Sequence, residues 1–183
     1  LLNFERIQSI VVQAEEINKT ECRNLQFVIA TNLAVITDEI LAFCAEHNVL
    51  ISTSLDGPED LHNKNRPRPG RNSHQLALAG IEKVRAALGH DRVSALMTTT
   101  RDSLPRVKEI IDEYVKLNFD GIFLRALSPY GFAIKTKQFS RYDRNAWLEF
   151  YKTGLDYIIE INKRGHNFIE HYAATILTKM LTP

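Results

Sequence analysis

Four short apolar runs, each followed by apolar residues at helical spacing, are the feature that most constrains the fold of this chain. The runs cover residues 25–30, 49–54, 92–97 and 121–124. Runs of this length are typical of strands that are buried on both faces of a parallel sheet. Strands that alternate with helices pair in parallel through right-handed crossovers. The sequence therefore predicts an α/β fold, either an open doubly wound sheet or all or part of a barrel.

Helical spacing and capping residues also predict where the helices begin. Asn3 is placed to cap a helix over residues 4–17, and Thr37 to cap a short helix in which Cys44 is buried. Ser73 is placed to cap a helix that ends at Gly89. Three later helices are predicted over residues 103–115, 145–163 and 169–181.

Composition excludes several classes of protein. The 183 residues contain no apolar run near the roughly 20 residues that span a bilayer. The 23 basic and 22 acidic residues nearly cancel, which argues against sequence-independent nucleic-acid binding. The cysteines, Cys22 and Cys44, are too few for a disulfide framework or a three-thiolate cluster, and we expect reduced, core-filling thiols in a cytoplasmic protein. Because the first residue is not Met, we expect a processed chain or a piece of a longer one.

Polar side chains follow the predicted strands. In parallel architectures ligands bind at the carboxyl ends of the strands, where polar side chains and helix N-termini converge. Thr, Ser and Asp are equally common in turns and caps, so each residue alone fits either role. The candidates are Thr31 and Asn32; Ser54 and Asp56; Thr98, Thr99 and Thr100; and Leu124, Arg125 and Ser128.

An arginine-rich loop over residues 66–71 follows the turn that contains Asp56. Its guanidinium groups could hold an anion in a bidentate fork, or they could pair with Glu59 and Asp60 on a solvated surface. Hydrolase, phosphate-loop and zinc-protease motifs are absent from the sequence, and the six histidines are scattered over different predicted elements. We therefore expect no metal ligands in this chain.

Residues 54–66 (SLDGPEDLHNKNR) resemble a segment of radical S-adenosylmethionine enzymes that modify peptides and proteins, above all anaerobic sulfatase maturases with a SPASM segment. In that family S-L-D-G-P is followed by a histidine, an Arg, a Gly and a Ser, an order that Arg66, Gly70 and Ser73 keep. Thr31-Asn32 matches the family's T-N-G, but Leu33 replaces the glycine, which predicts loss of the usual turn because Leu resists positive φ.

The resemblance extends over residues 1–132. Residues 1–4 resemble the segment that follows the family's G-G-E-P motif, and residues 124–132 (LRALSPYGF) resemble, more loosely, the maturase of the His-Xaa-Ser peptide system. The resemblance implies a partial TIM-like (β/α) barrel over residues 1–132, lacking its first strand and the cysteine loop. Residues 133–183 would form a helical extension toward a C-terminal SPASM-type segment.

The resemblance also implies cofactor-binding residues. Ser54 and Arg66 would contact the methionine and ribose parts of S-adenosylmethionine, and Leu124 would pack beside its adenine. Asp56 would fix the turn, and Asn32 would lie near the cofactor or the substrate.

The implied activity is that of an oxidoreductase that modifies a peptide or protein through a 5'-deoxyadenosyl radical. The 4Fe-4S cluster would take its ligands from outside this chain, so we expect the 183 residues alone to be inactive and to dimerise through an open sheet edge near residues 25–30. Two alternatives remain: a stand-alone α/β domain that binds an anionic small molecule at residues 66–71 without catalysis, and a lyase that uses Asp56.

Overall fold

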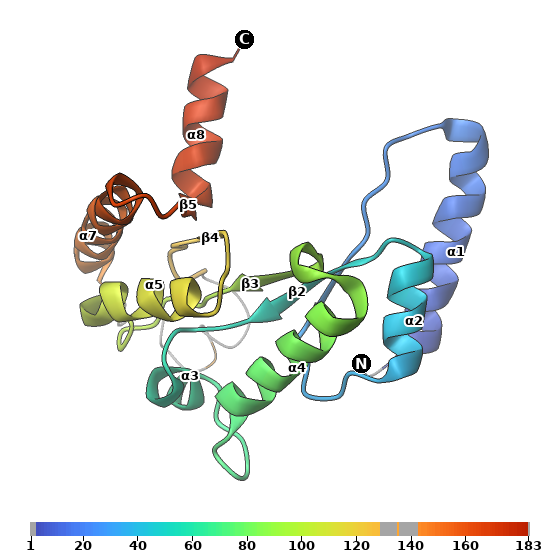
Figure 1. Ribbon diagram of the computed structural model, residues 1–183, viewed down its shortest axis with the longest axis horizontal. Helices are drawn as coiled ribbons and strands as arrows, with labels where there is room; N and C mark the ends of the chain where they lie inside the picture. Colours follow the sequence, from blue (N-terminus) through green and yellow to red (C-terminus); the bar gives the residue numbers. More distant parts are fainter. Residues whose placement is uncertain (1–2, 129–134, 136–142, 183) are drawn as a thin grey trace. The chain divides into compact units, whose positions relative to one another are not determined.

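The computed structural model describes residues 3–128, 135 and 143–182, which belong to two compact units (Figure 1). The first unit consists of Leu1–Ser54 and Gln75–Ser94, and the second of Leu55–His74 and Ala95–Pro183. The boundary that we predict between residues 132 and 133 lies outside the described residues. None of the helices in the described segments combines the length and the apolar character that crossing a membrane requires.

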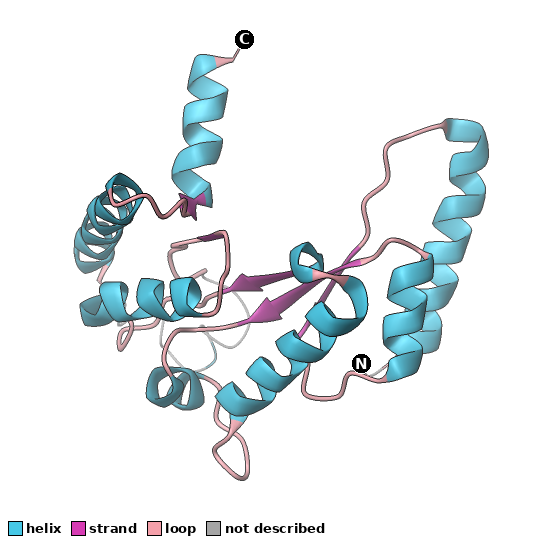
Figure 2. Cartoon of the chain, viewed as in Figure 1, coloured by secondary structure: helices cyan, strands magenta, loops and turns pink. Residues whose placement is uncertain are grey.

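The first unit contains the parallel strands that the apolar runs predict. Strand β1 (Val28–Thr31) pairs in parallel with β2 (Leu50–Ser54). Strand β3 (Val93–Leu96), whose first two residues belong to this unit, completes the order β1-β2-β3 (Figure 2). The helices of this unit are α1 (Phe4–Glu21), α2 (Asp38–Glu46) and most of α4 (Ser73–Leu88), with the 3-10 turn η1 (His90–Arg92) before β3. Helices α1 and α2 run side by side in Figure 1. The α/β class and the parallel pairing are confirmed.

The second unit holds a separate pair of strands. β4 (Gly121–Ile122) pairs in parallel with β5 (Ile169–Glu170), so the prediction of a helix over residues 169–181 is wrong at its first two residues. Asn162 explains the extended start, because its side-chain amide exchanges hydrogen bonds of 2.8 and 2.9 Å with the backbone of Phe168. The helices are α3 (Glu59–Asn65), α5 (Val107–Lys116), α7 (Arg144–Lys163) and α8 (His171–Leu181), with η2 (Leu104–Arg106) before α5.

Two predictions about burial are wrong in the first unit. Strand β1 is buried on one face only, since Val28 is 53% exposed and Ile29 is 8% exposed. Side chains alternate between the two faces of a strand, and Ala30, on the same face as Val28, is exposed as well. Cys44 is buried as predicted, but Cys22 is exposed because it follows the last turn of α1 in a left-handed conformation.

The predicted caps hold for two helices and fail for a third. Asn3 accepts a hydrogen bond from the Arg6 amide at the start of α1, and Thr37 accepts one from Ile40 at the start of α2. Ser73 is instead the first residue of α4, and its hydroxyl donates to Asn63 Oδ1 over 2.8 Å. The same Asn63 oxygen also accepts from the His74 amide, so a side chain of α3 caps α4.

The prediction that Leu33 disrupts the turn after β1 is wrong, because Leu33 adopts the left-handed conformation. Its φ is 57°, and the turn is held by Thr31 Oγ1, which accepts from the Leu33 amide, and by Asn32 Oδ1, which accepts from the Ala34 amide, each at 3.2 Å. Leu33 is 2% exposed, and a Cβ built on Gly80 of α4 would lie 2.4 Å from the Leu33 Cβ. Burial of the leucine side chain offsets the cost of a left-handed turn, and Gly80 provides the space.

Replacing Gly80 by alanine is expected to lower the free energy of unfolding by about 1–3 kcal/mol, because the added methyl overlaps the Leu33 Cβ. Alanine's better helix propensity recovers part of that cost. Urea unfolding measures the change, and the double variant Leu33→Gly/Gly80→Ala is the control, since glycine at position 33 leaves room for the methyl. Strict additivity of the two single costs would contradict the packing explanation.

Candidate functional site

Asp56 lies at the centre of the hydrogen-bonded site in the second unit. Its carboxylate is 0% exposed and accepts hydrogen bonds from Arg66 Nε at 2.8 Å and Arg66 Nη2 at 3.1 Å. Its Oδ1 also accepts one from the Thr98 amide at 2.8 Å. A bidentate guanidinium–carboxylate pair with an added amide donor is among the stronger charge-assisted arrangements. The carboxylate thus joins the turn before α3, the end of α3 and the segment after β3.

The sequence left open whether the arginines of residues 66–71 form surface ion pairs with Glu59 and Asp60, and Arg66 does not form them. Arg66 binds Asp56 and also donates from Nη2 to Thr98 Oγ1 at 3.3 Å, while its side chain remains 31% exposed. Asp60 pairs with Arg106, whose guanidinium lowers the pKa of the Asp60 carboxyl. Arg66 is therefore held in one orientation by a buried carboxylate and still reaches solvent.

The backbone around Asp56 is fixed by two further contacts. Gly57 has a φ of +116°, and a Cβ there would lie 2.8 Å from Ile110 Cγ1. The hydroxyl of the fully buried Tyr114 donates to the Leu55 carbonyl at 2.6 Å, and burial raises the pKa of that hydroxyl. Only glycine combines this backbone conformation with so close an approach to α5.

His62 and its neighbours are functional candidates that the sequence reasoning did not single out. His62 is buried and its Nδ1 accepts a hydrogen bond from the Asp56 amide at 3.2 Å. Its ring meets the His74 ring edge to face at 5.5 Å, and His74 Nε2 lies 3.0 Å from Glu113 Oε1. The histidine in the S-L-D-G-P segment was the available signal, because a polar residue one helical turn after a tight turn can reach back to it.

Burial lowers the pKa of His62 from 6.5 to about 4. Between pH 6.5 and pH 4, His62 is protonated in the unfolded chain but neutral in the folded chain. The free energy of unfolding should therefore fall as the pH falls from 6.5 to 4. We expect His62 to contribute up to about 3 kcal/mol to this fall, measured by urea unfolding across the pH range. His62→Asn, which keeps an acceptor near Nδ1, should flatten the profile, whereas His166→Asn at an exposed position should not. A profile that His62→Asn leaves unchanged would contradict this cause.

Among the buried polar atoms without a hydrogen-bond partner in the described residues, two lie on or next to segments that carry predicted cofactor residues and could bind a ligand. The Asn65 Oδ1 accepts from Thr100 Oγ1 at 3.0 Å, but the buried Asn65 Nδ2 has no hydrogen-bond partner among the residues that the structure describes. In the first unit, Thr53 Oγ1 of β2 is also buried without a partner in the described part of the chain. Unpaired buried polar atoms are costly, so these two favour a polar ligand.

The structure brings two of the five predicted cofactor residues together, Asp56 and Arg66. Asn32 is exposed, and Ser54 is half-buried at the end of β2; both belong to the first unit. Leu124 is fully buried, and its amide donates to Glu170 Oε1 at 3.0 Å. The roles of these five residues toward a cofactor stay predictions. Residues 129–132 of the stretch that resembles a His-Xaa-Ser maturase, and residues 1–2 at the start of the chain, lie outside the described residues.

The thiols of this chain do not fit an iron–sulfur cluster. Cys22 and Cys44 are free thiols at the end of α1 and within α2. Within residues 3–128, 135 and 143–182, no three His, Cys, Asp or Glu side chains are grouped to hold a metal. Asp56 does not fit the lyase interpretation either, because its buried carboxylate already accepts three hydrogen bonds.

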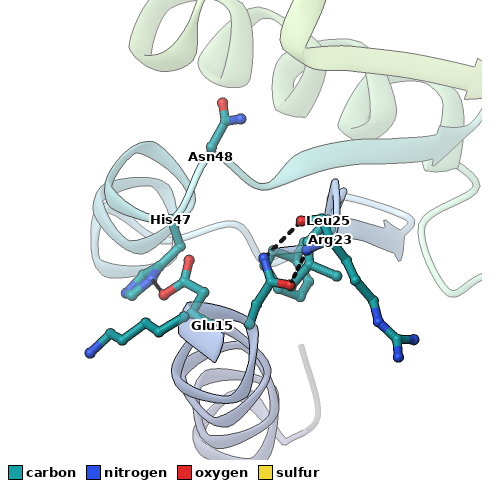
Figure 3. Close-up of a pocket in the computed structure, with 8 residues that line it drawn as sticks. Glu15, Arg23, Leu25, His47 and Asn48 are labelled. Carbon is teal, nitrogen blue, oxygen red and sulfur yellow. Dashed lines mark hydrogen bonds and ion pairs between the residues drawn. The ribbon is translucent and has the colours of Figure 1, made fainter. Parts of the chain in front are cut away.

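A pocket of about 400 Å³ opens in the first unit, lined by α1 and the residues that precede β1 and β2 (Figure 3). Its polar groups satisfy one another: Glu15 pairs with His47 at 2.8 Å, and the Asn18 amide bonds to the backbone of Arg23. Phe27 and Asn48 lie just before β1 and β2, so the pocket opens at the amino ends of these strands, away from the carboxyl ends where parallel folds bind their ligands. The pocket therefore supplies no argument for a ligand.

Comparison with known proteins bears on the fold. No protein-family model matches the chain. An uncharacterized protein of Methanothermobacter thermautotrophicus is 34% identical over 91 residues, which are 49% of this chain and 32% of that protein. Native anSMEcpe with bound AdoMet superposes with a TM-score of 0.69 and 17% identity over 93% of this chain and 47% of that one. The structure of native anSMEcpe with AdoMet and the Cp18Cys peptide superposes with a TM-score of 0.68 and 17% identity, over 86% of this chain and 44% of that one.

At this identity the likeness concerns the fold. This chain spans about half the length of the solved enzyme and about a third of the Methanothermobacter thermautotrophicus protein. The resemblance found in the sequence is thereby confirmed at the level of fold. Over 93% of its length this chain is similar in fold to anSMEcpe, and that solved protein is an anaerobic sulfatase-maturating enzyme of the radical S-adenosylmethionine SPASM type.

Proposed function

We propose that this chain is the central part of a radical S-adenosylmethionine enzyme that modifies a peptide or protein. The observation that carries the proposal is the Arg66 side chain, locked by buried Asp56 and the Thr98 segment, in a chain whose fold matches an enzyme solved with bound AdoMet. In this proposal residues 1–132 belong to a partial (β/α) barrel, and residues 133–183 form a helical extension that leads toward a SPASM-type segment.

The residues fit an amino-acid-like cofactor. Asp56 engages the Nε and Nη2 groups of Arg66, so the outer edge of the guanidinium can bind the methionine carboxylate or a ribose hydroxyl. Ser54 supplies a hydroxyl, and Asn65 Nδ2, adjacent to Arg66 in the sequence, is a donor without a partner among the residues that the structure describes. We assign Leu124 to the adenine and Asn32 to the edge of the cofactor or substrate site. Asp56 acts through Arg66 and is a positioning residue.

When reduced by a 4Fe-4S cluster, S-adenosylmethionine supplies the 5'-deoxyadenosyl radical that starts hydrogen abstraction. The two thiols of this chain do not fit that cluster, so we propose that its ligands lie elsewhere in the whole protein and that these 183 residues alone are inactive. A peptide substrate is supported by the related structure with a bound peptide. A cytoplasmic location is proposed from the free thiols.

The open edge of β1 supports one further prediction. β1 ends the described strand order, and Val28 on it is 53% exposed. An unpaired edge favours pairing with a second chain, so light scattering should report twice the 20.9 kDa chain mass. Replacing Val28 by lysine should restore the monomer, and a monomeric parent chain would contradict the prediction.

Calorimetric titration of the full-length gene product with S-adenosylmethionine tests the binding role of Arg66. We expect Arg66→Lys to weaken binding at least about tenfold, because lysine cannot form the fork that holds Asp56 while facing a ligand. Arg71→Lys in the same loop is the matched control and should leave the affinity unchanged. Equal affinities of all three proteins for S-adenosylmethionine would contradict the binding role of Arg66. Saturable binding of inorganic phosphate in place of S-adenosylmethionine would favour the non-catalytic anion-binding alternative.

A further inference from the structure

A chain of aromatic contacts lies at the carboxyl ends of β4 and β5, within the second unit. The Phe123 ring, directly after β4, meets the Tyr172 ring of α8 at 5.5 Å, edge to face. Tyr172 in turn meets Tyr151 of α7 at 6.4 Å, and Tyr151 meets Trp147 at 5.5 Å. Four aromatic rings from three separate segments therefore form one cluster, which we call the aromatic cluster.

Buried Glu170 holds this cluster in place. One of its carboxylate oxygens accepts from the Leu124 amide at 3.0 Å, and the other accepts from the Tyr151 hydroxyl at 2.8 Å and the Ala173 amide at 2.6 Å. Burial and this carboxylate raise the pKa of Tyr151, so the hydroxyl stays protonated and keeps donating. The carboxylate ties α7, the start of α8 and the segment after β4 together, which makes the cluster a preformed surface.

Two residues of the aromatic cluster and the neighbouring Arg125 have surface or hydrogen-bonding capacity that the described residues leave open. Tyr172 is 45% exposed, although it is a large aromatic residue in a ring cluster. Trp147 Nε1 is buried without an acceptor in the described residues. The Arg125 guanidinium lies 5.6 Å from the Phe123 ring and makes no ion pair with any described residue. An exposed aromatic surface, a buried donor without an acceptor in the described residues and an arginine without an ion pair to a described residue thus occur together.

We propose that the aromatic cluster and Arg125 bind the substrate as an acidic peptide segment with apolar side chains. The aromatic faces suit apolar side chains, Trp147 Nε1 suits a backbone carbonyl, and Arg125 suits a carboxylate. The carboxyl ends of parallel strands are where parallel folds bind their ligands. That the bound peptide is the substrate rests on the proposed function, whereas the binding of the peptide itself does not depend on catalysis. The near-neutral charge of the chain disfavours a nucleic acid as the occupant.

Trp147 is the single tryptophan of the sequence, so its fluorescence reports directly on the cluster. We would titrate the 183-residue chain with the acetylated, amidated peptide LEFEL and with its neutral counterpart LQFQL. LEFEL should change the fluorescence in a saturable way and bind about tenfold more tightly than LQFQL. Arg125→Gln should abolish the difference between the peptides, and Tyr172→Ala should weaken both. Arg101→Gln, an exposed arginine after β3, is the matched control and should change neither.

No saturable response to LEFEL, equal affinities for both peptides, or a preference that survives Arg125→Gln would overturn the inference. So would saturable quenching by adenosine 5'-monophosphate with none by LEFEL, since it would make the cluster a nucleotide site. Circular dichroism of each variant excludes unfolding as the cause of lost binding. If LEFEL binds but the full-length protein makes no 5'-deoxyadenosine, the proposed function fails and the peptide site stands; the reverse result removes the peptide site alone.

Discussion

Replacing Asp56 by alanine is expected to lower the free energy of unfolding by about 3–5 kcal/mol, measured by urea unfolding. The substitution leaves Arg66 without its bidentate partner and the Thr98 amide without its acceptor. Because Arg66 is 31% exposed, water can solvate part of the freed guanidinium, so we expect a value near the lower end of that range.

Asp60→Ala is the matched control for this prediction. Asp60 also pairs with an arginine, Arg106, but its side chain is 70% exposed, so we expect a loss of at most about 1 kcal/mol. Replacing both Arg66 and Asp56 should lower the free energy of unfolding by less than the sum of the two single substitutions. Each single substitution leaves the remaining charged side chain without its partner, whereas the double substitution removes both charges. Equal effects of the Asp56 and Asp60 substitutions would show that burial of the Asp56 pair does not matter.

Replacing Gly57 by alanine is expected to cost about 2–4 kcal/mol in the same experiment. The φ of +116° disfavours any side chain, and the new methyl would lie 2.8 Å from Ile110 Cγ1 on α5. The backbone shift that relieves this overlap would also move Asp56 and its bond to Arg66. The substitution should therefore weaken S-adenosylmethionine binding by the full-length protein as well as stability.

Gly165→Ala separates the two causes. Gly165 has a φ of +91°, and nothing lies within 4 Å of the position that a Cβ would take, so alanine there meets the backbone cost alone. We expect it to be milder than Gly57→Ala by the cost of the steric overlap. Similar losses for both glycines would indicate that the contact with α5 is unimportant.

Local patterns predicted those elements whose apolar residues repeat regularly. Helices α1, α2 and α7 and strands β2 and β3 were predicted because each carries its own apolar periodicity. Helix α3 was missed because it is almost entirely polar and buries only Leu61 and His62. Strand β4 was predicted from the apolar run over residues 121–124, but its partner β5 was missed because β5 depends on Asn162 holding Phe168, a contact that no periodicity encodes.

The sequence identified residues of the candidate site, but it did not show which hydrogen bonds join them. The motif predicted that Asp56 and Arg66 belong to one site, and the structure joins them. The Asp56 carboxylate also accepts a hydrogen bond from the backbone amide of Thr98. Every residue except proline carries such an amide, so the type of residue at position 98 could not predict this bond. Leu33 shows the converse: its left-handed turn contradicts local preference and is stable because the side chain is buried against Gly80.

Formation of 5'-deoxyadenosine is the most direct test of the proposed function. The full-length gene product and the 183-residue chain would each be reconstituted anaerobically with iron and sulfide, then reduced in the presence of S-adenosylmethionine. We predict 5'-deoxyadenosine from the full-length protein and none from the 183 residues. No product from the full-length protein, or measurable turnover by the 183-residue chain alone, would contradict the account.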